Sequence, residues 1–210
     1  MSKKVKEYRI HDRPVQDISA LEPEATYSYA DYLKWNFVER VELIKGKLFQ
    51  MSPASARKHQ EVSRNILINY GNFLKGKPCE VFSAPFDVRF PDKKGLPDKE
   101  TFTVVQPDIC VVCDLTKLDD AGCVGAPDLI VEIISPSTSS KDLNEKLHLY
   151  EEFGVKEYWV AYPNEKMITI FKLGPYGYSE ATRYTLGQKV TSTVLIGLET
   201  EVNEIFEGVD

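Results

Sequence analysis

Acidic residues lie within apolar segments of this chain, where charged side chains are unusual. Asp108 lies inside the apolar segment 104–113, and Glu132 lies inside a second one, 127–135. An unpaired carboxylate in apolar surroundings is costly, so each residue needs a cation or hydrogen-bond donors nearby. Mg²⁺ is one such cation, and it prefers oxygen ligands from one or two carboxylates together with water. A metal ion held there could activate a water molecule and neutralise charge on a phosphodiester.

Four Pro-Asp pairs occur in the chain, and their positions separate them. Asp92 and Asp98 lie in a polar loop, away from any apolar run. Asp128 opens the strand that carries Glu132, but four strand residues place the two roughly 13 Å apart, too far to share a metal ion directly. Asp108 opens the neighbouring predicted strand and can approach Glu132 across the sheet. The sequence therefore favours Asp108.

A lysine beside such a pair could orient the attacking water or stabilise developing negative charge. The residue two positions after Glu132 would project to the same side of the strand, but it is Ile134. Lys146 lies in the following predicted helix, with Asp142 four residues before it and Tyr150 four after it, on one helix face. Lys146 could complete the site, or it could form a surface pair with Asp142 worth about a few tenths of a kcal/mol. The residue pattern leaves both interpretations open.

Glu42 lies in the first strand of a predicted hairpin over residues 41–51. Two β-rich runs flank Lys45-Gly46, and the glycine supplies the positive φ that a tight turn needs. From its spacing alone, Glu42 is either an edge-strand side chain that faces water or a residue directed to the site.

A long helix is predicted after Pro53 and Ser55, ending near Lys75 before Gly76. Its apolar stripe has the spacing of one helix face and consists of Val62, Ile66, Tyr70 and Phe73. Three cationic or titratable side chains occupy its first turn: Arg57, Lys58 and His59. They could be placed for a phosphate, or they could be a solvated helix end.

Cysteines occur at positions 79, 110, 113 and 123, and the pair at 110 and 113 has the CxxC spacing of zinc and redox sites. The surrounding sequence is typical of a strand, where residues three apart point to opposite faces, and no second CxxC is nearby. A zinc site is one interpretation, and small buried strand residues are the favoured one.

The remaining patterns predict a mixed α+β fold with one mixed central sheet flanked by helices. The other predicted elements, in chain order, are a helix over 28–37 with Ser28 as N-cap, a strand over 79–90 interrupted at Pro85, a polar loop over 91–101, strands over 104–113 and 127–135, a helix from Ser137 to about Phe153 ended by Gly154, strands over 156–162 and 166–173, and further short strands ending near Phe206. Residues 1–25 are expected to form a polar arm, and residues 26–210 a single domain.

Composition bounds the possible partners. The chain of 210 residues is 42% hydrophobic and 28% charged, which is enough to build a core, and its net charge is −6. A protein that binds nucleic acid through its overall field is usually basic, so this one would need a local basic groove or metal ions. No apolar run has the length of a membrane span, and the N-terminus lacks the apolar part of a secretion signal. We therefore expect no membrane partner and a cytoplasmic location.

Several motifs together resemble those of the Uma family of restriction-endonuclease-like proteins, within the PD-(D/E)XK nuclease superfamily. The resemblance extends over nearly all of residues 26–206. The segments that carry it are Gln106-Pro-Asp-Ile, Gly125-Ala-Pro-Asp-Leu-Ile-Val-Glu-Ile-Ile-Ser-Pro-Ser-Thr138, Asp142 with Lys146 and Tyr150, Gly154-Val-Lys-Glu-Tyr-Trp159, Glu39 to Leu48, Met51-Ser-Pro-Ala-Ser55 with His59, Val194-Leu-Ile-Gly197, and Ile205-Phe206.

The resemblance implies a nuclease-type sheet flanked by helices, with Asp108 and Glu132 as the metal ligands. It also implies that Lys146 replaces the missing strand lysine and that Glu42 faces the site. Mg²⁺ or Mn²⁺ would be the cofactor, DNA the partner, and a homodimer a possible assembly. This chain departs from the family pattern in having Lys45-Gly46 in place of Asp-Gly and Tyr162-Pro163 in place of Asp-Pro. Both departures leave the proposed ligands intact.

The function that follows is an Mg²⁺-dependent endonuclease that hydrolyses DNA phosphodiester bonds. The acidic net charge keeps open an alternative, a non-catalytic module of the same fold that binds a protein or a nucleic acid. A metal-dependent hydrolase acting on another substrate is a third hypothesis.

Overall fold

The computed structural model describes residues 14–51, 56–93, 95–135 and 140–210, with the side chains of residues 140–142 excepted. Predictions that involve Pro53 and Ser55 before the first long helix, and Ser137 before the second, lie outside the described residues. The division into an arm over 1–25 and a domain over 26–210 stays a prediction.

The main sheet is mixed, and this confirms the predicted fold class. Its strands lie in the order β12-β11-β10-β9-β6-β3, with β13 beside β11. Strands β9 and β10 run parallel, while the other described pairs of this sheet are antiparallel. The strands are β3 (Glu80–Ser83), β6 (Ile109–Val112), β9 (Leu129–Ile133), β10 (Glu157–Tyr162), β11 (Met167–Gly174), β12 (Gly177–Tyr178) and β13 (Thr182–Thr185).

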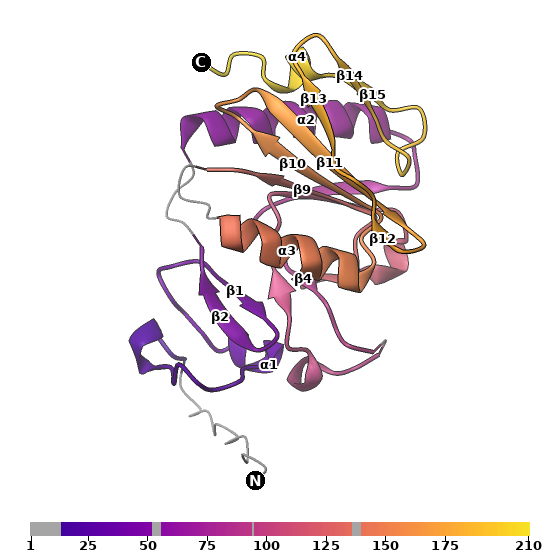
Figure 1. The fold of residues 1–210 in the computed structure, drawn as a ribbon. Helices are drawn as coiled ribbons and strands as arrows, with labels where there is room; N and C mark the ends of the chain where they lie inside the picture. The colour runs from indigo at the N-terminus through magenta and orange to yellow at the C-terminus, as the bar shows by residue number, and fades with distance from the viewer. Residues whose placement is uncertain (1–13, 52–55, 94, 136–139) are drawn as a thin grey trace.

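Two helices cover opposite faces of this sheet (Figure 1). Helix α2 (Arg57–Leu74) lies on one face, and α3 (Ser140–Phe153) lies on the other and connects β9 to β10. A parallel strand pair needs such a crossover connection, because the chain must return to the same end of the sheet. Gly154, at φ 84°, follows the last residue of α3, in agreement with the predicted stop.

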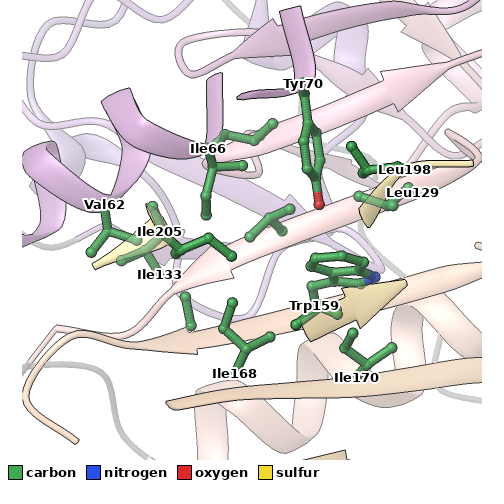
Figure 2. Close-up of a cluster of buried hydrophobic side chains, with 14 of the residues drawn as sticks. Val62, Ile66, Tyr70, Leu129, Ile133, Trp159, Ile168, Ile170, Leu198 and Ile205 are labelled. Atoms are coloured by element: carbon green, nitrogen blue, oxygen red, sulfur yellow. The ribbon is translucent and has the colours of Figure 1, made fainter. Parts of the chain in front are cut away.

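The predicted apolar stripe of α2 forms the core on its face of the sheet. Val62, Ile66 and Tyr70 are at most 1% exposed, and Figure 2 shows them directed toward the strands and the C-terminal segment. Phe73 is partly buried at the edge of this cluster. The labelled partners are Leu129, Ile133, Trp159, Ile168, Ile170, Leu198 and Ile205. Short elements complete this side of the molecule: β14 (Lys189–Thr191), β15 (Glu199–Glu201) and α4 (Val202–Ile205).

A second sheet, in the order β2-β1-β5-β4-β8-β7, lies on the far side of α3 from the main sheet (Figure 1). Side chains of this sheet and of α3 share one hydrophobic cluster with the main sheet. The strands are β1 (Val41–Ile44), β2 (Lys47–Gln50), β4 (Val88–Arg89), β5 (Val104–Val105), β7 (Leu118–Asp119) and β8 (Gly122–Val124). The predicted hairpin is confirmed as β1 and β2, with Lys45 at φ 50° and Gly46 at φ 76° in its turn. Short 3₁₀ helices are η1 (Ile18–Ala20), η2 (Asp98–Glu100) and η3 (Leu115–Lys117).

The strand predicted over 104–113 is two strands in two different sheets, β5 and β6. Pro107 has no N–H to donate, and the N–H of Gln106 donates to a side chain of β1 instead of to a partner strand. The chain therefore leaves the second sheet at Gln106 and enters the main sheet just after Asp108. The strand predicted over 79–90 divides between the two sheets in the same way, as β3 and β4.

The N-terminal helix is shorter than the predicted 28–37. Helix α1 spans Tyr29–Tyr32, and Ser28 is its N-cap as predicted, with the Asp31 carboxylate accepting from the Ser28 backbone N–H at 2.9 Å. The chain beyond it is drawn away from the helix because the Asn36 N–H donates to the carbonyl of Val15 at 2.8 Å.

The cysteines form no zinc site among the described residues. Cys110 and Cys123 are buried free thiols, in agreement with the favoured interpretation, but Cys113 forms a disulfide with Cys79 that the sequence analysis did not predict. The antiparallel register of β3 and β6 pairs Glu80 with Val112 and so places the two cysteines opposite each other. In the described part of the chain, no helix combines the length and apolarity needed to span a membrane.

Candidate active site

Asp108 and Glu132 lie opposite each other on neighbouring strands. Strands β6 and β9 pair Ile109 with Val131 in antiparallel register. Asp108, one residue before Ile109, therefore lies opposite Glu132, one residue after Val131. One Asp108 oxygen, Oδ2, accepts from the backbone N–H of Ile133 at 2.7 Å, which fixes the carboxylate at the strand end. The structure thus brings together the two residues that the sequence favoured as metal ligands.

Glu132 is 9% exposed, and its Oε1 accepts two hydrogen bonds from α3. The Lys146 amine donates at 2.9 Å and the Tyr150 hydroxyl at 2.7 Å. Burial raises the pKa of Glu132 above the ordinary carboxyl range, and the charge of Lys146 opposes this effect. The negative charges of Asp108 and Glu42 add to the increase. A buried carboxylate whose pKa is shifted by burial and by nearby charges marks a candidate functional site.

Lys146 bridges two carboxylates from different sheets. Its Nζ lies 2.9 Å from Glu132 Oε1 and 3.0 Å from Glu42 Oε1, and its side chain is 16% exposed. Burial acts to lower the pKa of Lys146, but the attraction of Glu132 and Glu42 outweighs burial and raises it, so the amine stays charged. Both carboxylates that this amine contacts among the described residues lie at the site. The Asp142 side chain lies outside the described residues, so the alternative of a surface pair with Asp142 is not tested.

Glu42 is 4% exposed and directed inward, so its interpretation as a water-facing edge residue is wrong. The strand that carries it is not an edge strand, since β1 lies between β2 and β5. Glu42 Oε1 accepts from Lys146 and from the backbone N–H of Gln106 at 2.9 Å. The resemblance placed Glu42 at the site, and its position in the structure agrees with that.

His59 approaches Asp108 from the other face of the sheet. It lies in the first turn of α2, is 8% exposed, and its Nε2 is 3.1 Å from Asp108 Oδ2. Its second ring nitrogen, Nδ1, is buried without a hydrogen-bond partner in the part of the chain described. The neighbouring cations of that turn do not join it: Arg57 pairs with Glu61 at 3.0 Å, and Lys58 donates to Asn164 at 3.4 Å.

Gln106 and Tyr150 have contacts at the site that the sequence did not assign. The Gln106 backbone bonds to Glu42, while its side-chain amide donates to Asp87 at 2.8 Å and so connects the site to the second sheet. The sequence feature that could have pointed to Gln106 is its position before Pro107, where the backbone is restricted. Tyr150 was placed on the face of Lys146, but only the fold shows that its hydroxyl reaches Glu132.

The donor set fits a hard divalent cation with few protein ligands. Among the described residues, no group of three or more His, Cys, Asp or Glu side chains is arranged to hold a metal ion. Two carboxylates are nonetheless the number that Mg²⁺ commonly takes, with water and substrate oxygens completing its coordination. Asp108 Oδ1 and Glu132 Oε2 accept no hydrogen bond from the described part of the chain, so an oxygen of each remains for a cation.

Comparison with known proteins identifies relatives of this chain. The model of the Uma2 family, described as "Putative restriction endonuclease", matches residues 29–203. A solved structure from Anabaena variabilis ATCC 29413, described as a "putative nuclease belonging to DUF820", superimposes with a TM-score of 0.67 at 18% identity. That superposition covers 85% of this chain and 97% of the other. At this identity, the superposition shows a shared fold.

A protein of Synechocystis sp. described as uncharacterized is 27% identical over 130 residues. The match covers 61% of this chain and 64% of the Synechocystis protein, so this chain spans less than two thirds of that relative.

Proposed function

The chain belongs to the Uma2 family, and we propose that it is an Mg²⁺-dependent endonuclease that hydrolyses phosphodiester bonds in DNA. The family description supports a nuclease-like function, and the metal ion and the DNA substrate are our proposal. The observation that carries the proposal is the convergence of Glu42, Asp108, Glu132 and Lys146, which come from two sheets and a helix.

Asp108 and Glu132 would hold the metal ion. When bound, Mg²⁺ would supply a Lewis acid that lowers the pKa of water and neutralises charge on the phosphate. The backbone N–H of Ile133 holds Asp108 in place, and the hydroxyl of Tyr150 does the same for Glu132. Because these donors belong to a strand and a helix of the core, the carboxylates are preorganised.

Lys146 would position the attacking water and stabilise the negative charge that develops on the phosphate. Its amine is held by Glu132 and Glu42, so it is charged and its direction is fixed before a substrate arrives. Glu42 would act through Lys146, and it could also accept a hydrogen bond from a water. Lys146, on a helix, could take the role of the strand lysine that is missing here, since its amine reaches Glu132 on that strand.

Cleavage of supercoiled plasmid in Mg²⁺ or Mn²⁺ tests the proposal. We expect nicking and linearisation by the unmodified protein and none by Asp108→Ala or Lys146→Ala. Lys156→Ala is the matched control, because Lys156 also pairs with a buried aspartate, Asp128, but at 2.6 Å and away from the site. Circular dichroism of each variant would show that it is folded.

Cleavage that persists in both Asp108→Ala and Lys146→Ala would contradict the site assignment. Metal binding lost in Asp108→Ala, with no plasmid cleavage by the unmodified protein, would favour a hydrolase of another substrate. No cleavage and no metal binding would favour a non-catalytic binding module. A cytoplasmic location and a homodimer stay predictions.

A further inference from the structure

A cleft with a mixed polar and apolar lining opens beside the candidate active site, on the α2 side of Asp108. Its volume is about 290 Å³, and Asp108 and His59 form part of its wall. Its other polar lining residues are Arg40, Gln60, Ser63, Arg64 and Ser83. Leu67, Ile68 and Ala84 also line the cleft. The cleft therefore shares a carboxylate with the site and adds donors and positive charge to partly apolar walls.

One wall of the cleft is a face of α2 that carries polar side chains and Leu67. Gln60, Ser63, Arg64 and Leu67 are spaced by three, one and three residues, which places them on one helix face. This face is next to the buried face of Val62 and Ile66, so the rigid packing of α2 on the sheet fixes its direction. The opposite side includes Arg40, just before β1, and the end of β3 at Ser83–Ala84.

The two arginines of the cleft lack an acidic partner within the described residues. Arg64 donates only to the side-chain oxygen of Asn65, at 3.0 and 3.2 Å, and both Arg40 and Arg64 are exposed. Arg57 and Arg89, by contrast, are each paired with a carboxylate. In a chain of net charge −6, two guanidinium groups without a carboxylate partner among the described residues give this cleft a local positive charge.

We propose that this cleft binds the phosphodiester backbone of the strand that is cut, with Arg40 and Arg64 contacting phosphates that flank the scissile one. The proposal rests on the proposed function and adds where the strand lies: along the N-terminal half of α2. Arginine suits this task because its planar fork matches phosphate oxygens, and Gln60 and Ser63 add uncharged donors. These contacts read the backbone and no base sequence.

The positive charges of the cleft also offset the repulsion between an approaching phosphate and the carboxylates of the site. A phosphate that approaches Asp108, Glu132 and Glu42 meets three carboxylates, and Lys146 offsets only part of their charge. Guanidinium groups at the mouth of the cleft attract the strand before the carboxylates repel it, and so raise the local concentration of substrate. The acidic chain thereby gains the local basic groove that its net charge requires.

Fluorescence anisotropy with labelled oligonucleotides tests this cleft. All proteins would carry Glu132→Gln, so that the strand stays uncut and one repelling charge is removed. Each of Arg40→Ala and Arg64→Ala should weaken binding about tenfold, and the double variant should lower the slope of log K against log salt by about 2. Arg57→Ala is the matched control, since Arg57 lies on the same helix but is paired with Glu61 outside the cleft. Parallel measurements with duplex DNA, single-stranded DNA and RNA show which kind of nucleic acid the cleft binds.

The outcomes distinguish failure of the cleft assignment from failure of the proposed nuclease function. If the unmodified protein cuts plasmid, but Arg40→Ala and Arg64→Ala leave binding unchanged in the Glu132→Gln protein and cleavage unchanged when Glu132 is retained, the cleft assignment is overturned while the nuclease function stands. An equal loss in Arg57→Ala would also overturn it, because a general field would then explain binding. Failure of the parent protein to bind or cut any nucleic acid would overturn both.

Discussion

Two glutamates lie buried on adjacent strands of the main sheet, and their surroundings differ. Glu157 pairs with Leu129 in the parallel register of β10 and β9, three residues before Glu132 on β9. Because three is an odd offset along a strand, Glu132 and Glu157 project to opposite faces of the sheet. Glu132 faces α3 and the second sheet, whereas Glu157 faces α2 and the C-terminal segment.

Glu157 is 0% exposed and satisfied by the fold itself. Its Oε2 accepts from Trp159 Nε1 at 3.0 Å and from the Ser192 hydroxyl at 2.8 Å, and its Oε1 accepts from the backbone and hydroxyl of Thr193 at 2.6 and 2.5 Å. The Lys172 amine is 4.0 Å away. Both oxygens are occupied, so Glu157 ties the segment around Thr193 to the sheet.

Glu132 is satisfied on one oxygen only, and by a cation shared with a second carboxylate. Its neighbours therefore include like charges, which Glu157 lacks among its bonded contacts. The difference shows that burial of a carboxylate in a strand does not identify a site. What identifies one is an incomplete set of donors together with nearby carboxylates.

The same substitution at the two glutamates should have opposite effects. Glu132→Gln keeps the shape and the Tyr150 bond but removes the charge that would hold a metal ion. We expect plasmid cleavage to fall at least about 10³-fold, equivalent to about 4 kcal/mol, with no loss of stability. Cleavage kinetics and denaturant unfolding measure the two effects. Glu157→Gln is the control, and equal cleavage loss in both variants would remove the distinction.

Glu157→Gln should destabilise the protein by about 2–3 kcal/mol and leave cleavage by the folded protein unchanged. The amide NH₂ must replace one oxygen, and it would then face donors such as Trp159 Nε1 or the Thr193 N–H that cannot turn away. Denaturant unfolding gives the loss, and cleavage assayed well below the melting temperature gives the activity. A stable Glu157→Gln variant would mean that the segment around Thr193 is held by other contacts.

The raised pKa of Glu132, from 4.5 to about 7, should make the stability of the protein depend on pH by about 3 kcal/mol. Because the pKa of Glu132 is raised in the folded state, the unfolded chain releases that proton first as the pH rises above 4.5. Unfolding is then favoured, so the unmodified protein should lose stability relative to Glu132→Gln as the pH increases from there toward the raised pKa. Each pKa unit of difference corresponds to about 1.4 kcal/mol.

Urea unfolding at a series of pH values, with the exposed Glu207→Gln as control, measures this effect. Parallel stability curves for the unmodified protein and Glu132→Gln would contradict the raised pKa.

The sequence by itself determined what depends on local periodicity. The spacing of Val62, Ile66 and Tyr70 defined the buried face of α2, and Lys45-Gly46 defined the hairpin turn. The apolar runs selected Asp108 and Glu132 from among the acidic residues, since a charge inside such a run needs a reason. The resemblance, and not periodicity, supplied the roles of Glu42 and Lys146.

Only the tertiary structure decided which residues meet. Glu42 reaches Gln106, 64 residues away, because β1 pairs with β5, and His59 reaches Asp108 because α2 packs on the sheet beside β6. The Cys79–Cys113 disulfide and the cleft beside Arg40 and Arg64 depend on the same placements. Helix and strand periods fix the face to which a side chain points, but strand order and helix docking fix what it faces there.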